Sequence, residues 1–163
     1  MQTQAPQNPH DPQRRLSPHF SLAELTVSNS GARAGLRNVP VGTALDNLTR
    51  LAQLLESVRT VLHHAPILVS SGYRSPAINN LVGGSLASAH TRGLAADFIA
   101  PRFGPPRAVC EAIRASSVQF DQLIFEGTWV HIAAPAAGAV PRREVLTAVF
   151  RGGMPVHYLK GIA

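Results

Sequence analysis

The chain has 163 residues, of which 45% are hydrophobic and 15% charged, and its formal net charge of +6 corresponds to an isoelectric point of about 11.0. One cysteine, Cys110, excludes an internal disulfide and a cysteine-based zinc site, and no apolar run is long enough to span a bilayer. The basic residues are scattered rather than clustered with aromatic residues, so we expect no nucleic-acid partner. Residues 1–15 are rich in Gln, Pro and Asn, which predicts a disordered tail before a single domain at 16–163.

Helices are predicted where capping residues precede apolar residues at helical spacing. Ser21 and Glu24 form a capping box for a short helix. The leucines between residues 43 and 64 form the longest apolar stripe, which predicts a helix there. Two further helices are predicted over 75–82 and 104–116, where prolines stand at the start.

Strands are predicted over shorter apolar segments between these helices. The segment "ILVSSGY" predicts a buried strand, and "FDQLIFE" and "WVHIAA" predict a hairpin closed by the dipeptide "GT". The predicted strands span residues 67–73, 93–100, 120–126, 129–134, 143–150 and 156–160. Helices are interspersed with strands, and the last third of the chain contains short turns, so we expect an α+β fold with a small, mostly antiparallel sheet flanked by helices.

A candidate metal site emerges from the predicted hairpin. Because alternate residues of a strand share a face, Glu126, Trp129 and His131 project to the same side of the sheet. Asp97 lies within the otherwise apolar segment "LAADFIA", where a carboxylate needs a cation facing it, and His90 lies in the loop before it. If the two strands are neighbours, His90, Asp97 and His131 converge, and two imidazoles with one carboxylate suit one catalytic zinc ion with a position left for water.

Two further residues are candidates for catalysis beside this metal site. Glu126 lies on the His131 face, and a carboxylate beside zinc can take a proton from water and pass it to a leaving amine. Arg74 follows a predicted strand and offers planar donors for a carbonyl oxygen or a carboxylate. Tyr73 and Trp129 are candidates for the pocket wall and for stacking on the substrate.

At these residues the sequence resembles a known family. The segments "SSGYRSPAINNLVGGSLASAHTRGLAADF" and "FDQLIFEGTWVHIA" are similar to the zinc D-alanyl-D-alanine carboxypeptidase and L-alanyl-D-glutamate endopeptidase family, whose members cut the peptide stems of bacterial peptidoglycan and include many phage endolysins. The resemblance extends over about residues 19–160. It implies the α+β fold that this family shares with the Hedgehog signalling domain.

The resemblance also implies a role for each matching residue. The family's zinc ligands fall on His90, Asp97 and His131, and its substrate-binding and transition-state-stabilising arginine falls on Arg74. Ser88 falls on a serine that lies near the substrate's peptide or terminal carboxylate. Gly93 and Ala95 fall on family positions where small residues let the strand approach the site without themselves binding metal or substrate.

One position departs from the family pattern. Many members carry the catalytic carboxylate three residues before the last histidine, where this chain has Thr128. We therefore assign the general base to Glu126, five residues before His131. Two readings remain open: a peptidoglycan peptidase, or a zinc-containing peptidoglycan-binding module that is catalytically weak or inactive.

The sequence also raises expectations about partners and place of action. We expect a monomer whose partners are peptidoglycan stem peptides, with neither a nucleic acid nor a membrane bound. The N-terminus lacks the apolar segment of a standard signal peptide, so we expect synthesis in the cytoplasm and action on the cell wall after release, as in a phage or prophage lysis enzyme. Carboxypeptidase and endopeptidase activity both stay open, as do the D-Ala-D-Ala bond, the L-Ala-D-Glu bond and a cross-bridge as the bond that is cut.

Overall fold

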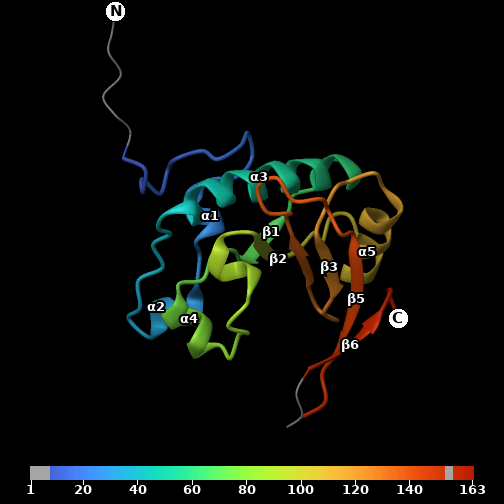
Figure 1. Cartoon of the computed structure of the whole chain (residues 1–163). Coiled ribbons are helices and arrows are strands. Elements are labelled where there is room, and N and C mark those ends of the chain that lie inside the picture. The colour runs from blue at the N-terminus through green and yellow to red at the C-terminus, as the bar shows by residue number, and fades with distance from the viewer. Residues whose placement is uncertain (1–7, 153–155) are drawn as a thin grey trace, which may run out of the picture.

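The structure, a computed structural model, describes residues 8–152 and 156–163. Within these residues, one six-stranded sheet has the order β1-β2-β4-β3-β5-β6 (Figure 1). The strands are β1 (Leu68–Ser71), β2 (Ala95–Ile99), β3 (Gln122–Phe125), β4 (Val130–Ala133), β5 (Glu144–Val149) and β6 (His157–Lys160). The helices are α1 (Leu22–Leu25), α2 (Asn29–Arg33), α3 (Thr43–Val61), α4 (Pro76–Leu81) and α5 (Pro106–Ala115), with a 3-10 helix, η1 (Ala89–Arg92).

Neighbouring strands of the sheet are antiparallel except for β3 and β5, which run parallel. The predicted α+β class with a mostly antiparallel sheet is therefore confirmed, with one parallel pair added. A parallel pair needs a crossover, and residues 134–143 make it between β4 and β5. The predicted closing pair of strands forms, and it places β6 at one edge of the sheet.

The hydrophobic core lies between one face of the sheet and the helices α3 and α5. Ala96, Phe98 and Ile132 point to this face, where they are fully buried. The apolar stripe of α3 and residues such as Ile113 of α5 pack against them. Figure 1 shows α3 running across the top of the sheet and α5 beside β3. Within the described residues, no long helix covers the opposite face of β2, β4 and β3, on which Asp97 and His131 lie.

Two local predictions differ from the structure. The segment around Leu68 was expected as a buried strand, but β1 is the other edge of the sheet and Leu68 is 52% exposed. The helix expected between residues 43 and 64 begins at Thr43 but already ends at Val61, and the following His63 and His64 have positive φ values of 52° and 61°. The capping box at Ser21 and Glu24 forms as predicted.

The N-terminal segment joins the domain next to α1. Residues 1–7 of the predicted disordered tail lie outside the described residues. Nearer the domain, the backbone N–H of Leu22 donates to Arg14 O at 2.8 Å, and Arg15 pairs with Ser21 in an isolated bridge. The domain boundary at residue 16 stays a prediction. No helix in the described part of the chain has both the length and the apolar character needed to cross a membrane.

Candidate metal centre

Three side chains meet on the open face of the sheet. Asp97 of β2 lies directly opposite His131 of β4, and alternation along the strands turns both toward this face. His90 reaches them from η1, which ends only a few residues before β2 begins. All three residues are buried, with exposed fractions of 3%, 6% and 8% for His90, Asp97 and His131. The structure thus brings together the three ligands that the sequence proposed.

The distances among their donor atoms fit a small tetrahedral ion. His90 Nε2 lies 3.3 Å from His131 Nδ1 and 3.2 Å from Asp97 Oδ1, and His131 Nδ1 lies 2.8 Å from Asp97 Oδ1. Zinc bonds of about 2.0–2.1 Å at tetrahedral angles place neighbouring ligand atoms about 3.4 Å apart. In the described residues this is the one group of three or more His, Cys, Asp and Glu side chains that converges in this way. The set fits one zinc ion and leaves a fourth position for water or substrate.

The orientation of His90 is set by the backbone of the loop after β1. His90 Nδ1 lies 2.7 Å from the carbonyl oxygen of Gly72. A carbonyl oxygen only accepts, so Nδ1 carries the proton and Nε2 presents its lone pair to the other two ligands. Gly72 has to be glycine, because a Cβ there would collide with the carbonyl group of Leu25.

Asp97 is paired with a cationic side chain, Arg74. Its Oδ2 accepts from Arg74 Nη2 at 2.6 Å, while Arg74 Nε donates to Ser71 Oγ at 2.8 Å. Burial alone raises the pKa of the Asp97 carboxyl, but the hydrogen bonds and charges of His131 and His90 outweigh it and hold this pKa well below its usual range. Asp97 is therefore an ionised ligand, with one oxygen toward the histidines and the other on Arg74.

The segment that carries Arg74 is fixed by a residue that the sequence gave no reason to select. Asn38 Nδ2 donates to Tyr73 O at 2.7 Å, and Asn38 Oδ1 accepts from the backbone N–H of Ser75 at 2.8 Å. The backbone N–H of Arg74 itself donates to His90 O at 3.1 Å. The main chain is thus held on both sides of Arg74. Asn38 is 36 positions away in sequence, and no local pattern links the two.

Glu126 lies where the hairpin prediction placed it. The backbone N–H of Glu126 donates to Trp129 O at 3.1 Å, and Ile124 pairs with His131, so Glu126 and His131 share a face. Burial raises the pKa of the Glu126 carboxyl, and the negative charge of Asp97 raises it further, while His131, Trp129 and Arg74 oppose the shift. A carboxyl whose pKa is raised toward neutrality is suited to proton transfer.

A cleft of about 560 Å³ opens over these residues. Ser88 lines it and accepts from the backbone N–H of His90 at 3.3 Å, and Trp129 lines it beside Glu126. Tyr73 does not line this cleft, because its side chain packs in the core with 3% exposed. The structure therefore does not bring Tyr73 to the site, although the motif around it holds Arg74 there.

Other residues of the cleft were not selected from the sequence. Arg142 Nη2 and Nε bind the Asp121 carboxylate at 2.6 and 3.0 Å, and this pair lines one end of the cleft. Phe150, directly after β5, and Tyr158 of β6 line the other end. Their positions depend on where β5 and β6 join the sheet, which no local motif encodes.

A second groove of about 660 Å³ lies between α3 and the loops around residues 117–119 and 134–139. Its lining includes Arg50, Gln53, Ser57 and Thr60 but no histidine, cysteine or carboxylate. It therefore lacks groups for metal binding or proton transfer, and the candidate site is the smaller cleft.

Comparisons with known proteins agree with the geometry. A sequence model of the family described as Peptidase M15 matches residues 18–133. The zinc D-Ala-D-Ala carboxypeptidase of Streptomyces albus G is 37% identical over 79 residues, which are 48% of this chain and 30% of that protein. The match thus spans less than a third of that relative's length. The three converging ligands lie within the family match, whereas β5 and β6 lie beyond it.

Proposed function

This chain belongs to the peptidase M15 family, and from that premise we propose that it is a zinc metallopeptidase that hydrolyses the stem peptides of peptidoglycan. The observation that carries the proposal is the convergence of His90, Asp97 and His131 on the sheet face that also presents Glu126. The name of the relative from Streptomyces albus G supports a D-alanyl-D-alanine end as the substrate.

The three ligands would hold the ion through His90 Nε2, Asp97 Oδ1 and His131 Nδ1. Zinc, when bound, supplies Lewis-acid polarisation of a water molecule and of the scissile carbonyl oxygen. The protein contributes a rigid and largely buried setting for this chemistry, because each ligand is fixed by β2, β4 or the Gly72 carbonyl.

Glu126 acts as the proton carrier. Its carboxylate takes a proton from the attacking water and returns it to the amine that leaves when the peptide bond breaks. Its position two residues beyond Ile124, on the His131 face, places it beside the ligands without making it one of them.

Arg74 and Ser88 bind the substrate. Two nitrogens of Arg74 are engaged by Asp97 and Ser71, and its Nη1 makes no hydrogen bond within the described residues, so this nitrogen is left for a substrate oxygen. A donor that is already fixed stabilises developing negative charge without reorganising. The hydroxyl of Ser88 lies at the start of η1 in the cleft wall, where it can donate to the substrate.

The enzyme is made in the cytoplasm and acts on the cell wall after release, as a phage or prophage lysis enzyme does. Its net charge of +6 supports this, because a basic surface is attracted to an anionic wall polymer.

The test is mass spectrometry of defined stem pentapeptides and purified peptidoglycan after incubation with the zinc-loaded protein. We expect loss of a terminal D-alanine, and a chelator should abolish it. An internal cut would instead make the enzyme an endopeptidase. No cleavage by a protein that holds one zinc ion per chain would favour the alternative function, a peptidoglycan-binding module.

A further inference from the structure

The cleft floor continues onto strands that lie outside the family match. Ile124 of β3 pairs with both His131 and Leu146, so the face that carries the metal ligands extends across β5. Phe125 pairs with Thr147, so the residues that follow them, Glu126 and Ala148, lie at the same level of the sheet. Ala148 in turn pairs with Tyr158 of β6. The pairing thus places Tyr158 of β6 level with Glu126 and on the same face of the sheet.

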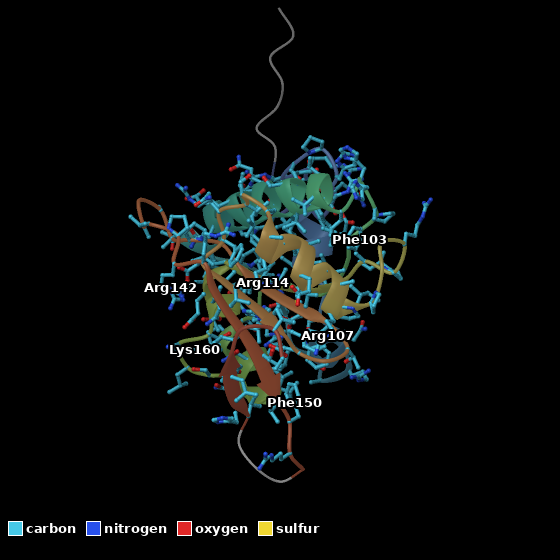
Figure 2. The ribbon with its side chains drawn as sticks, turned by 90° about the vertical axis from the view of Figure 1, so that its right-hand side faces the viewer. Phe103, Arg107, Arg114, Arg142, Phe150 and Lys160 are labelled. Carbon is cyan, nitrogen blue, oxygen red and sulfur yellow. The ribbon has the colours of Figure 1, made fainter. Side chains whose placement is uncertain are left out.

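Aromatic side chains gather at this end of the cleft. The rings of Trp129 and Phe150 lie 6.1 Å apart between centroids, at an angle of 48°, and both residues line the cleft together with Tyr158. Phe150 and Tyr158 are 54% and 48% exposed, so both present apolar surface to the cleft that they line with Trp129. Figure 2 marks Phe150 and Arg142 at opposite ends of β5.

The Tyr158 hydroxyl is available to a ligand. It makes no hydrogen bond to any residue in the described ranges. Burial raises the pKa of Tyr158, and the negative charges of Glu126 and Asp97 raise it further, so the phenol keeps its proton and stays a donor.

We propose that Trp129, Phe150 and Tyr158 form a substrate subsite that selects an uncharged side chain next to the scissile bond. The inference rests on the proposed function and adds the specificity of the same cleft. The aromatic rings offer apolar contact to a small side chain, and the Tyr158 hydroxyl donates to the substrate backbone.

An acidic side chain is excluded from this subsite by the charge of Glu126, which stands beside the aromatic group. The opposite end of the cleft has a different chemistry, because Arg92 lines it beside the ion pair of Arg142 with Asp121. An acidic group elsewhere on a stem peptide therefore has the Arg92 guanidinium to pair with. The segment from β5 to β6, which supplies Phe150 and Tyr158, thus determines which residue of the stem peptide lies at the metal.

The chain carries its own probe for this subsite, because Trp129 is its single tryptophan. The experiment titrates zinc-loaded Glu126→Gln protein, which does not consume the ligand, with a stem pentapeptide ending in D-Ala-D-Ala and follows tryptophan emission. We expect a saturable change. Tyr158→Ala and Phe150→Ala should each weaken Kd about tenfold, as is common for aromatic anchors. Because Glu126→Gln removes the charge that excludes an acidic side chain, this exclusion is measured on the wild-type protein. There, as a competitor, a peptide with D-glutamate in place of the last D-alanine should bind at least about tenfold more weakly than the pentapeptide.

The matched control is Leu159→Ala, which removes an exposed side chain from the same strand but from the opposite face. Its Kd should equal that of the parent protein, and circular dichroism should show all variants folded. Equal affinity for both peptides, an unchanged Kd in both aromatic variants, or no binding of the pentapeptide would overturn the subsite. Binding with the expected pattern by a wild-type chain that cleaves nothing would overturn the proposed peptidase and leave the subsite standing.

Discussion

At the scale of single residues, the proposed mechanism depends most on Glu126. It stands two positions from the family's usual place for the acid, yet the hairpin directs it to the His131 face. We expect Glu126→Gln to lower kcat by about 10²–10⁴, the usual contribution of a general acid–base group. Zinc content should stay at one ion per chain, because the residue is not among the three converging ligands. Kinetics on a stem peptide with a parallel zinc assay measures both, and turnover close to wild type would remove Glu126 from the mechanism.

Burial makes the thiol of Cys110 unreactive in the folded protein. It lies in α5 with no exposed surface, and burial, aided by the charge of Glu111, raises the pKa of its thiol to about 12. The thiolate is the reactive form, so the folded protein should react with a disulfide reagent very slowly and the unfolded protein at once. Absorbance of the released thiol in buffer and in guanidinium chloride compares the two. Complete reaction of the folded chain within minutes would contradict the buried position.

At the scale of elements, Gly93 links the 3-10 helix of His90 to the strand of Asp97. Its φ is +71°, and a Cβ would lie 2.5 Å from the carbonyl oxygen of Ala44 in α3. We expect Gly93→Ala to lower the free energy of unfolding by about 2–3 kcal/mol, through backbone strain and collision together.

Gly83→Ala is the control for this substitution. Gly83 has a φ of +70° but nothing within 4 Å of the added Cβ, so the loss there should be only about 1 kcal/mol. Denaturant unfolding of both variants separates strain from collision. Equal losses at the two positions would show that close packing against α3 does not explain Gly93.

The elements that the sequence predicted well are those with local determinants. The dipeptide at Gly127 and Thr128 fixes the hairpin register, and register fixes which residues share a face with His131. The position of β1 at the sheet edge was missed, because strand order depends on contacts between distant segments. The helix α2 was missed as well, since Gly31 weakens its local propensity and its place is secured by packing on Ile78 of α4.

The candidate site shows the same difference between features with local determinants and features that depend on contacts between distant segments. His90, Asp97 and His131 were found because a buried carboxylate needs a cation and alternation along strands gives its face. The Arg74–Asp97 ion pair, the Asn38 contacts and the approach of Tyr158 were not found. Each joins segments more than 20 residues apart, for which neither periodicity nor spacing gives a distance.

At the scale of the whole molecule, the two faces of the sheet differ: one packs the hydrophobic core and the other carries the candidate metal ligands. One face of the sheet buries the core against α3 and α5. The other face carries three buried ionisable side chains, His90, Asp97 and His131, and burying such groups costs free energy that a bound cation offsets. His90 Nε2 and His131 Nδ1 lie 3.3 Å apart around one carboxylate oxygen, an arrangement that a metal ion satisfies better than protons do. Metal binding and folding should therefore be thermodynamically linked.

This linkage gives a prediction for thermal unfolding. An ion that binds only the folded chain stabilises it by about 2.7 kcal/mol when its free concentration is 100 times Kd, which for a chain of this size raises Tm by roughly 5–10 °C. Differential scanning calorimetry with zinc and with a chelator measures the shift. His131→Ala should abolish it, because one of three ligands is lost, whereas His157→Ala at the exposed edge strand should retain it. Equal Tm values with zinc and with chelator would show that the three side chains do not bind the ion in the folded protein.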